Sequence, residues 1–291
     1  MSKIQSKAVK WGALALMLML ILAIGLGGCG DKTEPAVTET NHPATETDPS
    51  VSAVETPATK AGPPVAEDGV AIDEVNFPDL VFFDYVADVL DQNRDGVLSE
   101  NEIAAVMDIN LSYRDVSSMQ GIELFTGLEY LDCSGTYITE LDISKNINLL
   151  GLYCDAYDLT ELDVSNNTRL INLSCSGNQL KKLDIGKNIY LESLTCRDNL
   201  LTELDVSKNI NLRELGCDGN QLKELDISKN TKLIGLSCSD NQLAELNIRN
   251  NTELEKLDCS LNQMTELDIS QNKNINLQNL YYDKDTVKLT R

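Results

Sequence analysis

Histidine, tryptophan and basic side chains are scarce in this 291-residue sequence. It has one histidine, one tryptophan and 24 lysine and arginine residues against 46 aspartate and glutamate residues, so its formal net charge is −22. A chain this acidic repels phosphate backbones and anionic lipids, which excludes nucleic-acid binding or membrane binding by electrostatic attraction. The charge favours cationic partners or divalent ions.

The sequence also lacks the usual features of an active site. The single histidine, His42, lies in a stretch with almost no large apolar residue, and neither a G-x-S-x-G motif nor a glycine-rich phosphate loop is present. Acid–base catalysis by two of the many carboxylates stays open, but no pair of them stands out. We therefore expect a protein that is not an enzyme.

Seven of the eight cysteines recur at a fixed interval of 21 residues. They are Cys133, Cys154, Cys175, Cys196, Cys217, Cys238 and Cys259. Each repeat follows the pattern L-x-x-L-x-C-x-x-N-x-L-x-x-L-D-[IV]-S-x-N, and a fixed period of this length indicates a solenoid. Apolar and outward residues alternate at 215–217 and again at 225–227, which predicts two short strands and two turns in each coil, with little room for a helix.

One such coil cannot be stable alone. Its inward side chains contribute about 10–20 kcal/mol, whereas ordering the coil costs roughly 30 kcal/mol, so each coil needs neighbours above and below. Asparagines recur at both turns, where we expect them to bond backbone groups that a tight turn leaves unpaired. They are Asn178, Asn199, Asn220, Asn241 and Asn262 at one turn, and Asn146, Asn167, Asn188, Asn209, Asn230, Asn251 and Asn272 at the other.

The repeated cysteines are predicted to be a buried core ladder rather than disulfides, a redox centre or a metal site. In-register neighbours on a parallel ladder hold their Cβ atoms about 5 Å apart, whereas a disulfide needs about 3.8 Å. Their odd number would also leave one cysteine unpaired. A buried cysteine behaves as a small hydrophobic residue.

The N-terminal segment is typical of an exported protein. Three lysines precede an apolar run that ends in Leu26-Gly27-Gly28-Cys29, which resembles a bacterial lipobox. That resemblance implies a signal peptide at 1–28, cleavage before Cys29 and lipidation of its thiol; an uncleaved membrane anchor is the alternative. The Thr/Pro/Glu-rich residues 29–75 are predicted to be a disordered stalk, so the remaining chain is expected at the cell surface, tethered to a membrane.

Residues 76–110 are predicted to be a helix-loop-helix that resembles an EF-hand. The loop reads Asp91-Gln-Asn-Arg-Asp-Gly-Val-Leu-Ser-Glu-Asn-Glu102. The resemblance implies calcium ligands at Asp91, Asn93, Asp95, Val97 (through its carbonyl), Ser99 (through water) and Glu102 (bidentate). EF-hands usually pair and no second loop follows, so the unit is expected to be a clip that caps the first coil, with a calcium-dependent switch as the alternative.

Residues 111–291 are predicted to be the solenoid, comprising the seven cysteine repeats between an irregular entry coil and an irregular last coil. Taken together, residues 77–291 resemble bacterial surface proteins that carry short 21-residue leucine-rich repeats behind a single EF-hand. The resemblance implies a leucine-rich-repeat solenoid of the α/β horseshoe class, built mostly of short parallel β strands with few or no helices. It also implies a ligand-binding surface but no particular ligand.

Two columns of outward residues differ in how much they vary along the solenoid. The uniform column is Asp142, Asp163, Asp184, Asp205, Asp226, Asn247 and Asp268. It is interpreted as a solubilising face that prevents sheet-to-sheet association, or alternatively as a second calcium-binding face; lysines three residues later are expected to offset its charge. The variable column is Asp132, Tyr153, Ser174, Thr195, Gly216, Ser237, Asp258 and Tyr281.

Variation along a column suits a shaped recognition surface. Tyr130, Tyr137, Tyr153 and Tyr157 fall in adjacent coils, and tyrosine clusters are common binding anchors; alternatively, Tyr137 and Tyr157 fill gaps beside the cap. We take Tyr130, Asp132, Tyr153 and Arg213 as candidate contacts for a protein or a glycan. The alternative is a structural spacer of the envelope without a dedicated ligand. The protein is expected to be a monomer.

Overall fold

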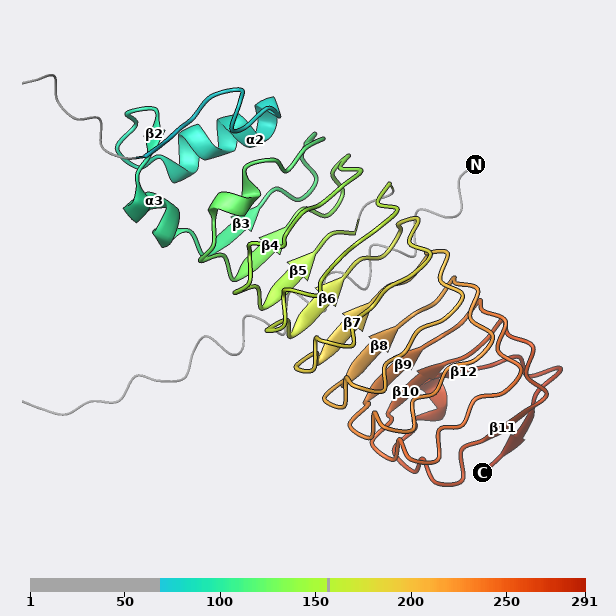
Figure 1. Cartoon of the computed structure of the whole chain (residues 1–291). Helices are drawn as coiled ribbons and strands as arrows, with labels where there is room; N and C mark the ends of the chain where they lie inside the picture. The colour runs from blue at the N-terminus through green and yellow to red at the C-terminus, as the bar shows by residue number, and fades with distance from the viewer. Residues whose placement is uncertain (1–68, 156–157) are drawn as a thin grey trace, which may run out of the picture. The chain divides into compact units, whose positions relative to one another are not determined.

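The computed structural model describes residues 69–155 and 158–291, which lie within one compact unit, Ala61–Arg291. Its main feature is a nine-stranded parallel sheet in the order β12-β10-β9-β8-β7-β6-β5-β4-β3, in which the successive coils each contribute a strand (Figure 1). The strands are β3 (Asp108–Asn110), β4 (Tyr130–Asp132), β5 (Gly151–Tyr153), β6 (Asn172–Ser174), β7 (Ser193–Thr195), β8 (Glu214–Gly216), β9 (Gly235–Ser237), β10 (Lys256–Asp258) and β12 (Leu280–Tyr281). The predicted signal peptide, Cys29, most of the stalk and Tyr157 lie outside the described residues.

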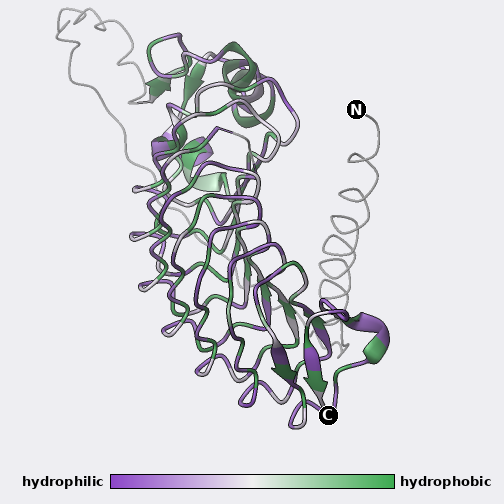
Figure 2. Cartoon of the chain, turned by 90° about the vertical axis from the view of Figure 1, so that its right-hand side faces the viewer, coloured by the Kyte–Doolittle hydropathy of each residue, from purple (hydrophilic) through white to green (hydrophobic). Residues whose placement is uncertain are grey.

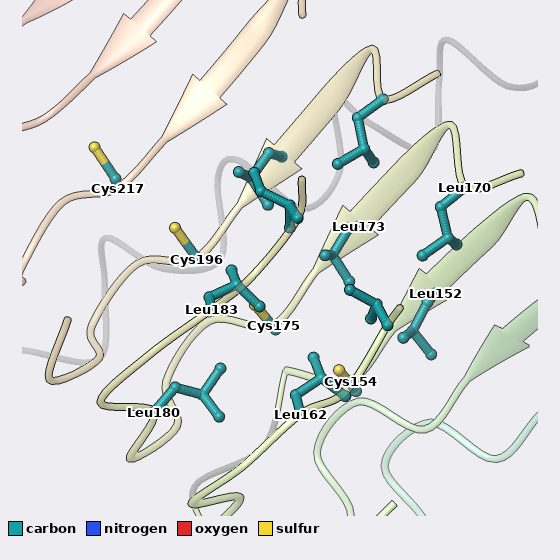
Figure 3. Close-up of a cluster of buried hydrophobic side chains, with 14 of the residues drawn as sticks. Leu152, Cys154, Leu162, Leu170, Leu173, Cys175, Leu180, Leu183, Cys196 and Cys217 are labelled. Carbon is teal, nitrogen blue, oxygen red and sulfur yellow. The ribbon is translucent and has the colours of Figure 1, made fainter. Parts of the chain in front are cut away.

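The 21-residue period sets the register of this sheet. The central leucines of neighbouring strands pair directly, as Leu152 does with Leu131 and with Leu173. The cysteine that follows each strand points into the core, and the labelled cysteines of four successive coils form a column (Figure 3). All seven are buried free thiols, and burial raises the pKa of Cys133 and of the other six. The predicted solenoid of parallel strands and its cysteine core are confirmed.

The second predicted strand of each coil is absent from most described coils. Of these stretches only β11 (Glu266–Asp268) forms a strand, which pairs in parallel with β13 (Lys288–Thr290). In the other described coils the equivalent stretch has irregular backbone, because its carbonyl groups accept hydrogen bonds from turn asparagines rather than from a neighbouring strand. The carbonyl of Ile143, for example, accepts the side-chain amide of Asn167 instead of a neighbouring strand.

Two asparagine ladders hold the turns, as expected from the sequence. In the first ladder the Asn220 amide donates to the carbonyl oxygens of Cys196 and Cys217, and its Oδ1 accepts the Leu201 N–H. In the second ladder the Asn209 amide donates to two carbonyl oxygens, while its Oδ1 has no partner among the described residues. The first ladder therefore satisfies backbone donors and acceptors, whereas the second satisfies acceptors only.

A helical segment covers the first coil. It comprises α2 (Leu80–Tyr85), the π-helical turn η1 (Val86–Leu90), β2 (Val97–Leu98) and α3 (Glu100–Ala105). Phe77 and Phe82 pack edge to face with centroids 5.6 Å apart and join the solenoid core. Asp79 caps α2 with Oδ1, and its Oδ2 accepts the Ser117 N–H at 2.7 Å, which ties the helix to the entry coil. Such contacts cover the apolar end that the first coil would otherwise expose.

The remaining elements complete the ends of the solenoid. The 3-10 turns η2 (Ile122–Leu124) and η3 (Leu277–Asn279) lie in the entry coil and in the last coil. Leu280 pairs with Leu257, so Tyr282 follows in the cysteine position and packs against the core. Hydrophobic and hydrophilic residues alternate along the coils (Figure 2). None of the helices within residues 69–155 and 158–291 is long and apolar enough to span a bilayer.

Candidate functional site

The acidic loop 91–102, which follows η1 and contains β2, is closed by its own carboxylates. Asp91 accepts the N–H groups of Arg94 at 2.7 Å and of Gly96 at 2.9 Å. At the far end, Glu102 Oε1 accepts the Gln92 N–H at 2.8 Å, while Oε2 accepts the backbone and hydroxyl of Ser99. These bonds from Ser99 lower the pKa of Glu102. Glu102 therefore links the start of the loop to its end.

The donor set of this loop fits a hard cation such as calcium. Asp91 and Glu102 are buried carboxylates, and Asn93 and Asp95 lie between them in sequence, so oxygen atoms supply every candidate ligand. Gly96 has a φ of 81°, which gives the sharp turn at the sixth loop position. As the side chains stand, no group of three or more His, Cys, Asp or Glu residues in the described part of the chain is close enough to hold a metal ion.

A segment that precedes the helices pairs with the loop. β1 (Val70–Ala71) lies antiparallel to β2, with Val70 opposite Leu98, and Ile72 donates its N–H to the Gly96 carbonyl at 3.0 Å. A Cβ atom on Gly69 would lie 2.5 Å from Val97 Cγ1 and 2.7 Å from the Leu98 oxygen, so only glycine fits there. β1 thus covers the outer edge of β2. Sequence analysis did not predict this strand, which falls within residues 29–75, the predicted disordered stalk.

The outward side chains of β3–β10 and β12 form the surface that we call the strand face. Tyr130 and Asp132 lie on β4, and Tyr153 lies directly beside Asp132 on β5. All three side chains are partly exposed. The structure thus brings together three of the four predicted contacts. Tyr137 is 62% exposed, which does not fit the alternative in which it fills a gap beside the cap.

Arg213, the fourth predicted contact, lies apart from the tyrosines. It is exposed and immediately precedes β8, so β6 and β7 separate it from β5. Three strand spacings amount to about 14 Å, beyond the reach of one small contact. Arg213 therefore belongs to a different part of the strand face.

Two further carboxylates, which sequence reasoning missed, organise the turns after β5 and β8. Asp155 accepts the Ser174 hydroxyl and the Ser176 N–H, both from the next coil. Asp218, three repeats later, accepts the Ser237 hydroxyl and the Ser239 N–H and hydroxyl in the same way. The sequence feature that marks both turns is a Cys-Asp pair in one coil followed by Ser-Cys-Ser in the next. Burial raises the pKa of Asp155, although the serine hydrogen bonds oppose the shift.

The uniform aspartate column has a structural role that neither interpretation of it named. Asp142 accepts the N–H of Ser144, two residues later, and this Asx turn recurs along the column. The equivalent acceptors are Asp163, Asp184, Asp205, Asp226, Asn247 and Asp268. Hydrogen bonds from Ser144 lower the pKa of Asp142, with a smaller contribution from Lys145, which confirms the predicted charge offset there. The column thus shapes the turns.

Several bacterial leucine-rich-repeat proteins resemble this chain in structure. The functional domain of InlJ from Listeria monocytogenes, which includes a cysteine ladder, is 29% identical over 78% of this chain and 62% of its own, with a TM-score of 0.48. A leucine-rich-repeat protein from Leptospira interrogans is 25% identical over 66% of this chain and 53% of its own, with a TM-score of 0.59. Internalin C2 from L. monocytogenes is 17% identical over 79% of this chain and all of its own, with a TM-score of 0.48. No protein-family profile and no curated protein matches.

These findings define the class of the protein. Its parallel strands and its repeat pattern make it a leucine-rich-repeat solenoid, and its fold is similar to that of the Leptospira protein. The chain spans less than two thirds of the length of the first two similar proteins.

Proposed function

We propose that this chain is a lipid-anchored bacterial surface protein that recognises a protein or a glycan through the strand face of its solenoid. The proposal rests on one observation: the outward side chain at the variable column of the strand face changes from each coil to the next, whereas the aspartate column and both asparagine ladders are nearly uniform. Uniform positions are those with a structural hydrogen bond in each coil. Varied positions on a rigid scaffold are free to match a ligand.

The anchor in this proposal is Cys29, which lies outside the described residues. The support is the lipobox-like sequence before it. Metabolic labelling with a fatty acid should mark the wild type and not Cys29→Ser. A wild type that takes up no fatty acid, or a Cys29→Ser variant labelled equally, would contradict the lipid anchor.

Calcium, in this proposal, stabilises the helical cap through the oxygen atoms of Asp91, Asn93, Asp95, Val97, Ser99 and Glu102. Bound calcium would supply a fixed positive charge that holds both ends of the loop together. A ligand that binds only the folded state stabilises it by RT ln(1 + [L]/Kd), which is about 2.7 kcal/mol at a hundredfold excess over Kd. We expect calcium to raise the Tm of the wild type and to leave the Tm of Glu102→Gln nearly unchanged.

The direct test of the binding function is affinity capture from bacterial and host surface extracts, in calcium and in EDTA, with variants of two faces. The strand-face variant is Tyr130→Ala with Tyr153→Ala; the control is Tyr190→Ala, which removes a tyrosine that is 57% exposed and lies away from the strands. We expect a partner that the wild type and Tyr190→Ala capture in both conditions and that the double variant loses.

Other results would point elsewhere. A partner that all three proteins capture equally would contradict binding through this part of the strand face. A partner lost only in EDTA, while the fold persists by circular dichroism, would favour a calcium-dependent switch. A protein that captures nothing would fit a structural spacer of the envelope.

A further inference from the structure

The chain holds one of its own arginines against the strand face. Arg197 Nε lies 2.8 Å from Asp218 Oδ2 in an ion pair that joins adjacent coils. Its guanidinium rests on Gly216, where a Cβ atom would lie 2.7 Å from Nε. Asp218 is in turn oriented by Ser237 and Ser239 of the next coil. We call this arrangement an arginine seat: the Asp218 carboxylate pairs with the guanidinium, and the Gly216 backbone packs against its flat side.

The carboxylate of this seat recurs three repeats earlier without the arginine and without the glycine, because Tyr153 takes the place of Gly216. Asp155 is equivalent to Asp218, and Ser174 and Ser176 hold it as Ser237 and Ser239 hold Asp218. The residue equivalent to Arg197 is Ser134, whose short side chain carries no charge. The ion pairs among the described residues are Arg197–Asp218, Arg249–Asp268 and Lys288–Glu266, so none of them involves Asp155.

At the equivalent position beside Asp155, aromatic rings replace the bare glycine backbone on which the guanidinium of Arg197 packs. Tyr153 takes the place of Gly216, and a Cβ atom on the neighbouring Gly151 would lie 2.8 Å from Tyr130 Cδ1 and 3.3 Å from Tyr153 Cε2. The two rings therefore converge on the bare backbone of Gly151. Within the described part of the chain neither phenol hydroxyl has a hydrogen-bond partner, so both are available to a ligand.

The surroundings of these rings are negative. Asp132 lies beside Tyr153 on the adjacent strand, and Asp108 follows on β3, where burial and then the charge of Asp132 raise its pKa. Burial, Tyr130 and the charges of Asp132 and Asp155 together raise the pKa of Tyr153 to about 12. The strands β3 to β6 contain no lysine or arginine to neutralise them. An arginine gains both from a carboxylate and from an aromatic face.

We propose that an arginine side chain of a protein partner binds the strand face between Tyr130, Tyr153 and Asp155, where Asp155 pairs with it as Asp218 pairs with Arg197 and the tyrosine rings replace the Gly216 backbone as the packing surface. This inference rests on the proposed function and names the chemistry of the partner, a basic polypeptide segment. A glycan would use the same rings by stacking but would not need the carboxylates.

The test adds an internal arginine beside Asp155 in one variant and removes the internal arginine beside Asp218 in another. Ser134→Arg supplies the missing internal arginine and closes the seat at Asp155, whereas Arg197→Ser opens a second seat at Asp218. Asp142→Asn changes the net charge by the same amount as Ser134→Arg in a turn that already tolerates asparagine at Asn247. The probes are a tetra-arginine peptide and its neutral citrulline counterpart, titrated by calorimetry and by NMR of labelled tyrosine rings in the full chain.

We expect the arginine peptide to bind and to shift the ring signals of Tyr130 and Tyr153, and the citrulline peptide to bind at least roughly tenfold more weakly. Ser134→Arg should weaken binding by roughly tenfold or more, Asp142→Asn by less than about twofold, and Arg197→Ser should add a second binding site. Equal binding to wild type and Ser134→Arg, or equal affinity for both peptides, would overturn the proposal.

Two checks keep the outcomes separate. If Ser134→Arg does not fold by circular dichroism, Tyr153→Ala takes its place, with Tyr281→Ala as the matched control at the other end of the strand face. If the surface partner still depends on Tyr130 and Tyr153 but the arginine peptide does not bind them, the arginine seat is wrong while the proposed function stands.

Discussion

The two asparagine ladders predict different costs for the same substitution in neighbouring turns. Replacing Asn220 with alanine leaves the buried Leu201 N–H without its partner. The carbonyl groups of Cys196 and Cys217 lose the Asn220 amide but keep one donor each, from Asn199 and Asn241. A buried group left unpaired costs about 1–3 kcal/mol and the lost amide bonds cost about 1 kcal/mol more, so we expect Asn220→Ala to lower the free energy of unfolding by about 3 kcal/mol.

Asn209→Ala, the matched variant, should cost much less. Its amide donates to the carbonyls of Ile185 and Asn188, but each of these oxygens also accepts a backbone N–H, from Asn188 and Leu191 respectively. The substitution therefore orphans no backbone group and removes an Oδ1 that had no partner among the described residues. The expected loss is about 1 kcal/mol, from two hydrogen bonds of modest net value.

The assay is thermal and urea unfolding of both variants beside the wild type, followed by circular dichroism. A difference of at least about 2 kcal/mol corresponds to a Tm that is about 4–8 °C lower for Asn220→Ala than for Asn209→Ala. Equal losses, or a larger loss for Asn209→Ala, would refute the assignment of backbone satisfaction to the first ladder.

Three further predictions concern strain, the β1 segment and pH. Leu261 has a φ of 56° and is 65% exposed, so Leu261→Gly should raise stability by about 1 kcal/mol, and a lower Tm would contradict the strain. Gly69→Ala should release β1 from Val97, seen as faster hydrogen exchange at Ile72; unchanged exchange would show that the pairing tolerates a Cβ atom. Hydrogen bonds lower the pKa of five aspartates of the uniform column, so their contribution to stability is complete above the unfolded pKa of about 4 and is lost as pH falls through the folded pKa; they are Asp142, Asp163, Asp205, Asp226 and Asp268. Burial raises the pKa of Asp155, which makes protonation stabilising, so the Tm should rise from pH 7 towards about pH 5 and fall below about pH 4; a Tm that falls steadily from pH 7 would contradict this.

The solenoid itself could be predicted from the sequence, because one short pattern dictates it. An apolar residue at each inward position of the repeats, mostly leucine, cysteine, isoleucine or valine, leaves one register in which apolar side chains meet, and Leu131, Leu152 and Leu173 pair as that register requires. The turn asparagines were also predictable, since a tight turn leaves backbone groups that need a partner.

The second strand was predicted wrongly because alternation alone does not make a strand. Residues 225–227 alternate as 215–217 do, yet their carbonyl groups bond turn asparagines or remain outside a ladder. A strand needs a partner with free N–H groups at the right spacing, which depends on the neighbouring coil. Among the described coils, only the coil of Cys259 forms one, at β11, because β13 of the last coil supplies that partner.

The strand-face seat was only partly visible in the sequence. Tyr130, Asp132 and Tyr153 stood out by their type, but Asp155 acquires its role from Ser174 and Ser176 in the next coil. Contacts between coils link residues about 20 positions apart, so the residue type at one position does not reveal such a contact. The comparison between Asp155 and Asp218 required the structure of both turns.

The most direct test of the account locates the point at which a surface partner contacts a single coil. A photo-crosslinking residue is placed in turn at Tyr153 on the strand face, at Glu161 beside the aspartate column and at Thr168 in the opposite turn, all partly or fully exposed. The account predicts that the captured partner crosslinks from position 153 and not from 161 or 168. Crosslinks of equal yield from 161 or 168 would contradict recognition through the strand face.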